Sequence, residues 1–326
     1  MARDDIRGYN HLVKLTGPSE AALIAGNIVT GQLTRNVRAT IITEQSLCVA
    51  GLLLEVKKMN YQDILDGIER FGSTKDNVCE LFLGVNSQKI HENVILAPWW
   101  EPTIFPIFLQ HIEQISAVCS VKVWNITRNN TTITYIKTGI GAPLLTDVVL
   151  ALGVTSCEKI VFIGSVGALK ETMSIGDIVI PEYAMNGNGV SRYLKGNPLT
   201  RQDSFGKKIH PDEGLYCVVH EYAQKVCGEQ HVSYHVGRTF SIDTIFAQYM
   251  YVDEIKNMGC DSIEMETASV FQAAKLARKK AVSILSVSDN TVTKKSLLSG
   301  RTEDDMNYRK HTRQTIFPQL IMELFR

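Results

Sequence analysis

From Val94 to the C-terminus, short apolar segments alternate with longer segments that have helical spacing. This alternation constrains the fold more than any other feature, because strands separated by helices of this length form an α/β domain around a central sheet. Ligands bind such domains at the carboxyl ends of the strands, so the residues that follow each strand are candidates for chemistry. The expected strands are 94–97, 132–137, 159–163, 177–181, 236–241, 262–265 and 281–286. The expected helices are 104–118, 143–152, 215–226, 247–258, 268–277 and 309–325.

Residues 1–90 lack this alternation. Helical spacing is visible at 19–33 and at 61–71, and the second of these segments ends at Gly72. Few clear strands precede Val94. The sequence therefore predicts a mainly helical N-terminal extension over 1–90 and one α/β domain over 91–326.

Composition and charge exclude several classes of function. Lys and Arg total 34, as do Asp and Glu, so the formal net charge is zero and no nucleic-acid or membrane surface is expected. No apolar run approaches the roughly 20 residues of a membrane span, and the charged N-terminus lacks the apolar core of a signal peptide. The seven cysteines have no C-x-x-C spacing, and the histidines have no metal-ligand spacing. These patterns favour free thiols in a reducing cytoplasm and no metal site.

Glycine-rich turns follow two of the expected strands, TGIG at 138–141 and GSVG at 164–167. Glycines at such turns allow backbone amides to approach an anion or a sugar hydroxyl. Glycine at a tight strand-to-helix turn is also commonly a structural choice. Each turn alone therefore leaves both interpretations open.

Two further strand ends carry carboxylates. Glu264 and Glu266 flank Met265 where an apolar strand meets an apolar helix, and a carboxylate buried there is costly unless donors satisfy it. A sugar diol supplies two donors, whereas a cap on the dipole of the following helix is the equal alternative. Asp289 follows Ser288 just beyond the last expected strand, where an acid serves either as a general acid or as a turn cap.

Taken in order, the segments TGIG, FIGSVGAL, GDIVIP, GRTFSIDTIF, SIEMETAS and SVSDN resemble the nucleoside phosphorylase-I superfamily. That superfamily includes purine nucleoside phosphorylases, uridine phosphorylases and methylthioadenosine nucleosidases. The resemblance covers about residues 92–325, and IEMETAS followed by SVSDN is its most specific part. It implies a cytoplasmic enzyme that cleaves the N-glycosidic bond of a nucleoside, without a cofactor and with orthophosphate as co-substrate. It also implies a central mixed, partly barrel-like sheet flanked by helices, and a homodimer or a hexamer built of dimers.

For the sugar, the resemblance implies that Glu266 accepts hydrogen bonds from the ribose hydroxyls. Met265 is expected to pack against the sugar face, and Glu264 to be a supporting contact. Thr138 and Gly139, in the first glycine turn, are expected among the substrate contacts.

For the base, the resemblance implies that Phe240 stacks on the ring and that Asp289, beside Ser288, protonates the departing base at N7. Breaking the C–N bond builds oxocarbenium character on the sugar and negative charge on the base, so an acid that donates to the base stabilises the leaving group. This acid favours a purine. Gln248 stands where uridine phosphorylases begin a Gln-x-Arg pair that reads uracil, but Met250 occupies the arginine position.

The expected phosphate subsite departs from the family. Gly164 and Ser165 match the family's phosphate turn, but Phe162 occupies the position of one phosphate arginine and Thr103 that of another. Each charge-assisted hydrogen bond contributes about 1.5–3 kcal/mol, so the loss of two should weaken phosphate binding by orders of magnitude. The space beside Ser165 is therefore expected to be narrowed by Phe162 and Trp99, with no arginine or lysine head group pointing in.

Three functions follow from this departure. A phosphorylase would need substitute cations, for which Lys122, Arg35 and Arg38 are the candidates. A hydrolase, as in the methylthioadenosine nucleosidases, would use Glu101 to activate water. A nucleoside-binding protein without catalysis would have its phosphate cavity filled by tryptophan. We rank the phosphorylase first, because the remaining motifs are the family's own.

Overall fold

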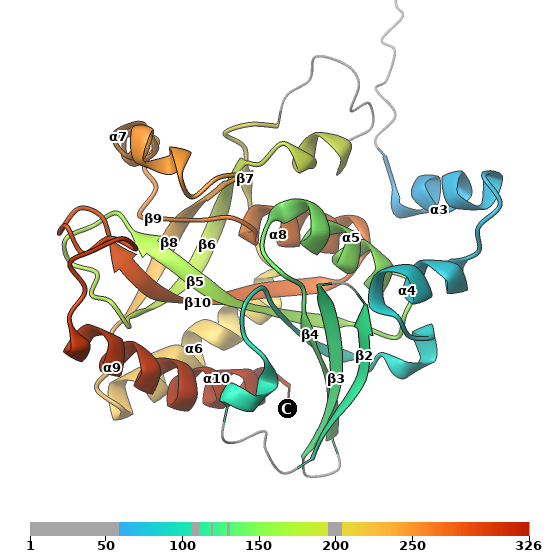
Figure 1. Ribbon diagram of the computed structural model, residues 1–326, viewed down its shortest axis with the longest axis horizontal. Coiled ribbons are helices and arrows are strands. Elements are labelled where there is room, and N and C mark those ends of the chain that lie inside the picture. Colours follow the sequence, from blue (N-terminus) through green and yellow to red (C-terminus); the bar gives the residue numbers. More distant parts are fainter. Residues whose placement is uncertain (1–58, 106–110, 119, 129–130, 195–203, 326) are drawn as a thin grey trace, which may run out of the picture. The chain divides into compact units, whose positions relative to one another are not determined.

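The computed structural model describes residues 59–105, 111–118, 120–128, 131–194 and 204–325 (Figure 1). The helix predicted at 19–33 lies outside the described residues, as do Arg35 and Arg38. The chain divides into two compact units, 1–55 and 56–326, and the second is described below. Its first two helices fall within the segment predicted to be a helical extension, whose boundary at residue 90 stays a prediction.

The expected α/β organisation is present in this unit. Its strands are β1 (Asn93–Ala97), β2 (Ile112–Val118), β3 (Val121–Arg128), β4 (Thr131–Lys137), β5 (Lys159–Ala168), β6 (Ile178–Gly187), β7 (Lys208–Ile209), β8 (Tyr234–Ile242), β9 (Ser262–Glu264) and β10 (Lys280–Asn290). Its helices are α3 (Tyr61–Arg70), α4 (Lys75–Leu83), α5 (Ala142–Leu152), α6 (Glu213–Glu229), α7 (Val252–Asn257), α8 (Thr267–Leu276), α9 (Glu303–His311) and α10 (Phe317–Leu324).

The strands form one mixed sheet, part of which closes on itself. The strand order is β10-β6-β8-β9-β5-β1-β4-β3-β2, and β10 also pairs with β5. The strands β5, β10, β6, β8 and β9 therefore make a closed ring, while β1, β4, β3 and β2 extend it as an open arm. Parallel pairing joins β5 to both β1 and β10, so the carboxyl ends of these three strands lie at one edge. The prediction of a mixed, partly barrel-like sheet is confirmed.

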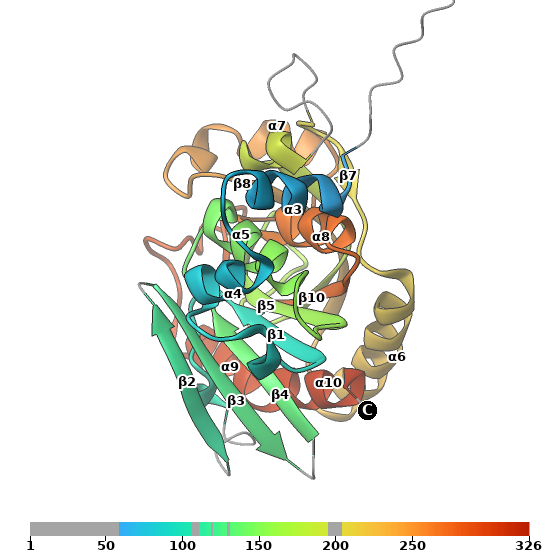
Figure 2. The same cartoon turned by 90° about the vertical axis from the view of Figure 1, so that its right-hand side faces the viewer.

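Helices cover the sheet on two sides. In both views α5 and α8 lie on one side of β5 and β10, and α6 and α10 lie on the other (Figures 1 and 2). Alternate residues of β5 enter different cores, because successive side chains of a strand point to opposite faces. Phe162 packs in the core that contains α5 and α8, whereas Val161 and Ile163 pack in the core that contains α6 and α10. Among the described helices, none is long and apolar enough to cross a membrane.

The helix predicted over 104–118 is wrong. Residues 112–118 form β2, which pairs antiparallel with β3, a strand that the sequence analysis missed. The segment IEQISAV reads as helical because its apolar residues are unevenly spaced. In the structure it is a half-exposed outer strand, and its hydrogen bonds to β3 decide its conformation.

The C-terminal segment predicted as one helix over 309–325 begins earlier and is interrupted. The first part, α9, starts at Glu303 behind a Thr302 capping box. A π-helical turn, Thr312–Ile316, then joins it to α10. Such turns insert an extra residue into a helix and are frequent at functional sites.

The turn Gly176–Asp177, just before β6, contacts both β10 and α9. The amide of Gly176 donates to the carbonyl of Val287, and the amide of Val287 donates to the carbonyl of Asp177, at 2.9 Å each. The buried carboxylate of Asp177 accepts a hydrogen bond from the hydroxyl of Tyr308 on α9 (3.3 Å). The backbone of α9 lies directly over Gly176, whose φ is +100°.

Replacing Gly176 by alanine is expected to lower the free energy of unfolding by at least about 2 kcal/mol. A Cβ there would lie 2.6 Å from the Tyr308 ring and 2.9 Å from the backbone nitrogen of Arg309. The positive φ would also strain any L-residue at this position. Urea denaturation measures the effect. The matched control is Gly67→Ala in α3, where an added Cβ meets nothing within 4 Å and a small stabilisation is expected. A loss below about 1 kcal/mol would contradict the prediction.

Candidate active site

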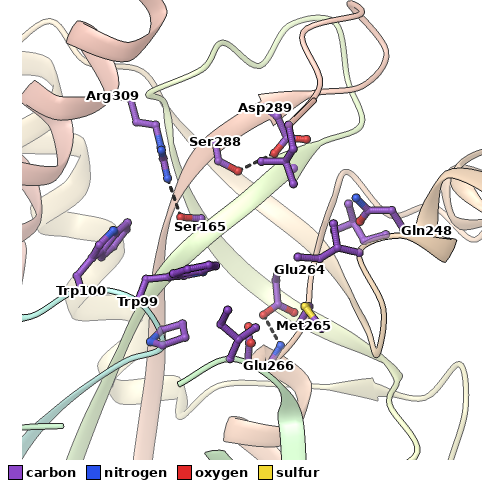
Figure 3. A pocket seen from close by; sticks show the side chains of 16 residues that line it. Trp99, Trp100, Ser165, Gln248, Glu264, Met265, Glu266, Ser288, Asp289 and Arg309 are labelled. Atoms are coloured by element: carbon purple, nitrogen blue, oxygen red, sulfur yellow. Dashed lines mark hydrogen bonds between the residues drawn. The ribbon is translucent and has the colours of Figure 1, made fainter. Parts of the chain in front are cut away.

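A pocket of about 390 Å³ opens at the carboxyl ends of β5, β9 and β10 (Figure 3). Its lining comes from loops and elements that are far apart in the sequence. Of the residues expected to form the site, it brings together Ser165, Gln248, Glu264, Met265, Glu266, Ser288 and Asp289. The remaining lining residues are Pro98, Trp99, Trp100, Ile140, Gly167, Ile245, Ile263, Leu297 and Arg309.

Glu264 and Glu266 are adjacent buried carboxyl groups with different hydrogen-bond partners. Glu264 accepts from the hydroxyl of Ser241 and from the amides of Glu266 and Thr267, both at 2.7 Å. One oxygen of Glu266 accepts from the amide of Gly141 at 2.7 Å. Glu264 thus accepts from three donors, and Glu266 from backbone amides alone, those of Gly141 and Met265.

This difference decides where the pair holds its proton. Burial raises the pKa of both carboxyl groups. Burial and the charge of Glu264 together raise the pKa of Glu266 to about 8. Three donors stabilise a charge on Glu264, and that charge opposes ionisation of Glu266, so the pair favours a proton on Glu266.

The first glycine turn, residues 138–141, donates a hydrogen bond to the carboxyl group of Glu266. Gly141 has a φ of +103° at the start of α5, and this conformation directs its amide at Glu266. Ile140 lines the pocket, whereas Thr138 and Gly139 lie behind the lining, with the Thr138 hydroxyl donating to the Gly139 carbonyl. The sequence predicts that an amide of this turn approaches an anion. In the structure the group that it approaches is the protein's own side chain, Glu266.

Asp289 is a buried acid at the end of β10. The hydroxyl of Ser288 donates to its Oδ1 at 2.6 Å. Burial raises the pKa of Asp289, although the Ser288 hydroxyl and the charges of Arg301 and Arg309 act in the opposite direction. A carboxyl group with a raised pKa is suited to giving a proton to a bound molecule.

The expectation that no arginine or lysine head group points to Ser165 is wrong. The Nη2 of Arg309, on α9, donates to the Ser165 hydroxyl at 2.8 Å, and Figure 3 shows this side chain reaching into the pocket. Phe162 does not narrow the space, because it is 1% exposed and faces the core under α5 and α8. Phe162 and Ser165 are three residues apart on a strand, so their side chains point to opposite faces. Trp99 does line the pocket.

Glu101 and Lys122 lie outside the lining and bind each other. The Nζ of Lys122 lies 2.8 Å from the Oε1 of Glu101, and the Nζ of Lys137 lies 3.3 Å from the same oxygen. These two lysines lower the pKa of Glu101. Lys122 is therefore engaged by a carboxylate rather than by the space beside Ser165.

Phe240 and Gly164 also lie behind the pocket. Phe240 is 2% exposed and packs in a core with Tyr183 and Ile263, its ring centroid 5.9 Å from that of Phe205. Gly164 packs against the ring of Phe162. Gln248, which was also considered for the base, is buried and does line the pocket.

Arg309 is the lining residue of greatest chemical consequence that sequence reasoning missed. The helical spacing of 309–325 indicates a terminal helix, and basic residues on such helices are usually solvated. The contact joins residues 144 positions apart. No local pattern around either residue signals it, so only the folded arrangement reveals the arginine.

Comparisons with known proteins match the part of the chain that contains most of the pocket residues. Residues 107–314 match the model of the phosphorylase superfamily, a span that includes the pocket residues from Ile140 to Arg309. A DeoD-type purine nucleoside phosphorylase of Bacillus velezensis is 24% identical over 214 residues, covering 64% of this chain and 88% of that protein. A guanosine phosphorylase of Halorubrum lacusprofundi is 28% identical over 172 residues, covering 52% and 66% respectively.

Solved structures show the same fold. A uridine phosphorylase from Vibrio fischeri ES114 matches with a TM-score of 0.59 and 20% identity, covering 73% of this chain and 93% of that chain. A purine nucleoside phosphorylase from Toxoplasma gondii, in complex with immucillin-H, matches with a TM-score of 0.59 and 17% identity, covering 74% and 94%. At these identities the likeness concerns the fold alone.

Proposed function

The chain belongs to the phosphorylase superfamily, and we propose on this basis that it cleaves the N-glycosidic bond of a nucleoside by phosphorolysis, with purine nucleosides preferred. One observation carries the proposal: the Glu264–Glu266 pair and Asp289 line one pocket, each with a raised pKa. The reaction needs a group that holds the sugar hydroxyls and a separate group that protonates the departing base. The pocket offers both.

Glu266 is proposed to bind the ribose. Its carboxyl group lines the pocket, and one oxygen is already fixed by Gly141, so the other is available to the sugar diol. Two hydroxyl donors stabilise the ionised form, so sugar binding is expected to lower the raised pKa of Glu266. Met265 lines the pocket beside it and supplies an apolar surface for the sugar.

Asp289 is proposed to protonate the base. As the bond between the sugar C1′ and the base nitrogen breaks, its electron pair passes to the base, and the Asp289 proton moves to N7. An oxygen of orthophosphate forms the new bond to C1′, which gives the free base and a pentose 1-phosphate. Proton transfer of this kind typically contributes about 10²- to 10⁴-fold to the rate.

The purine preference is supported by two features. A purine presents N7 to an acid, whereas uracil presents carbonyl oxygens that call for paired donors. Gln248 lines the pocket, but the residue two positions later, Met250, carries no donor. The matched purine nucleoside and guanosine phosphorylases are consistent with this preference.

We also propose that the chain assembles as a dimer or as a hexamer built of dimers. Large apolar side chains are exposed at or next to the pocket lining, among them Trp99, Ile140, Ile245 and Phe246. Burial of such side chains against a second copy would remove them from water. Light scattering of the purified protein measures the mass, and a monomer at micromolar concentration would contradict the assembly.

A panel of inosine, guanosine, adenosine and uridine, each with and without orthophosphate, tests the function. Purine nucleosides are expected to release base only when phosphate is present, with one pentose 1-phosphate formed per base. Chromatography of base and enzymatic assay of the sugar phosphate measure both products. Base release at the same rate without phosphate would indicate a hydrolase, binding without turnover would indicate a binding protein, and faster cleavage of uridine would overturn the purine preference.

A further inference from the structure

We propose that the guanidinium of Arg309 is a ligand of the orthophosphate, which binds between Arg309 and Ser165. The inference rests on the proposed phosphorolysis and names the residue of this chain that binds the co-substrate. Ser165 lines the pocket on β5, and Arg309 reaches it from α9, so the two side chains converge from different elements (Figure 3).

The hydrogen-bonding state of Arg309 indicates a missing anion. Its Nη2 donates to the neutral hydroxyl of Ser165, while its Nε is buried and has no hydrogen-bond partner in the part of the chain that the structure describes. Among the described residues, no carboxylate lies within ion-pair distance of Arg309. Burial, followed by the charges of Arg313 and Arg301, lowers its pKa to about 10, so the group remains protonated at neutral pH. A partly buried cation with an unused buried donor is stabilised when an anion completes the site.

The surrounding charge favours an anion as well. Arg301 and Arg313 both lie close enough to Arg309 to oppose its protonation, and Asp289 is the acid that favours it. The guanidinium of Arg313 lies over the ring of Trp100 at 5.5 Å, and its Nε is buried without a hydrogen-bond partner in the described part of the chain. Two further guanidinium groups thus act against the charge of Arg309, and one carboxyl group, that of Asp289, acts in its favour.

The position of Arg309 is fixed by its backbone. Tyr308, the preceding residue, donates its hydroxyl to Asp177 and accepts from the amide of Ser233. The Arg309 backbone itself lies on Gly176. The side chain thus extends from an anchored point on α9. Such an anchored guanidinium, with its planar set of donors, is well suited to binding phosphate.

The test is the dependence of turnover on phosphate in Arg309→Ala and Arg309→Lys. At saturating nucleoside, Arg309→Ala is expected to raise the KM for orthophosphate by about 10- to 100-fold, with the KM for nucleoside changed by less than about twofold. Arg309→Lys keeps the charge without the paired donors and should fall between. The matched control is Lys310→Ala, which removes an exposed positive charge from the next position of α9 and should leave the KM for phosphate unchanged.

Thermal unfolding gives a second readout that requires no turnover. Orthophosphate, compared with chloride at equal ionic strength, is expected to raise the Tm of the wild type and of Lys310→Ala by several degrees, but not that of Arg309→Ala. If Arg309→Ala fails to fold, Arg309→Gln and Arg309→Lys serve in both assays. A nucleoside 5′-monophosphate is the comparison ligand, because a substrate could carry the same phosphate chemistry.

The outcomes separate the inference from the proposed function. Phosphate-dependent cleavage with an unchanged KM for phosphate in Arg309→Ala would overturn the inference and leave phosphorolysis standing. Cleavage of nucleosides independent of phosphate would overturn phosphorolysis, and absence of the phosphate-dependent rise in Tm would then overturn the inference too. A rise in Tm with the 5′-monophosphate but not with orthophosphate would assign Arg309 to a phosphorylated substrate and contradict the proposal.

Discussion

Asp289→Asn is expected to lower kcat for purine nucleosides by about 10²- to 10⁴-fold. Asparagine keeps the shape of the side chain and can accept the 2.6 Å hydrogen bond from Ser288, but it has no acidic proton to give to the base. Steady-state rates of base release measure the loss. The control is Asp253→Asn, which neutralises an exposed carboxylate on α7 and should leave kcat unchanged.

A purine nucleoside methylated at N7 separates proton transfer from other roles of Asp289. Its base is already cationic and leaves without protonation, so Asp289→Asn should slow it far less than it slows the unmethylated nucleoside. An equal loss with both substrates would show that Asp289 acts by position or charge and not as an acid.

The wild-type rate with unmethylated substrate is expected to fall as pH rises through the raised pKa of Asp289. The rate of the Asp289→Asn variant should not show this fall.

Glu266→Gln is expected to weaken nucleoside binding by about 100-fold or more, because two charge-assisted hydrogen bonds to the sugar are lost. The amide oxygen of glutamine can still accept from Gly141, so the fold around the turn should persist. Calorimetric titration with a nucleoside measures the affinity. Glu254→Gln, at an exposed position of α7, is the matched control. Unchanged affinity in Glu266→Gln would place the sugar elsewhere in the pocket.

The same substitution is expected to stabilise the protein at alkaline pH. The pKa of Glu266 rises from 4.5 to about 8 on folding, so the folded state binds the extra proton and the free energy of unfolding falls as pH rises from about 4.5 to about 8. Glutamine removes this loss. Urea denaturation should therefore show Glu266→Gln more stable than wild type by about 2–5 kcal/mol at pH 8 and similar at pH 4.5. A difference that does not depend on pH would contradict the raised pKa.

The acidic residues of the pocket could be found from sequence because their signals are local. Glu264, Glu266 and Asp289 each lie at or just beyond the end of a recognisable apolar strand, and the ends of β5, β9 and β10 come together in this fold. The buried strand that carries Phe162 was equally recognisable. The prediction that Phe162 narrows the space beside Ser165 failed because side chains alternate along a strand. This alternation puts Phe162 and Ser165 on opposite faces of β5.

The other differences between the predicted and the observed structure depend on contacts between distant residues, so the local sequence could not predict them. The segment of β2 is half-exposed, and its pairing with β3 overrides an ambiguous spacing. Arg309 becomes part of the pocket only because α9 packs across the Gly176–Asp177 turn, and its partner Ser165 lies 144 positions away. The arginine of the proposed phosphate subsite therefore depended on tertiary packing, whereas the acids proposed for the sugar and the base could be found from motifs.

The Gly176–Asp177 turn has a consequence for how such a pocket can change through evolution. Its bonds to Val287 and Tyr308 set the spacing between the acid on β10 and the arginine on α9. The chain that connects these elements, residues 291–302, adds a second tie, because Lys295 bonds to Asn290 on β10 and to Asp305 on α9. Beyond Lys295, Leu297 forms part of the pocket wall. Substitutions around Leu297 can therefore reshape the proposed substrate-facing wall while Asp289 and Arg309 keep their places. Selectivity in this protein can diverge faster than chemistry.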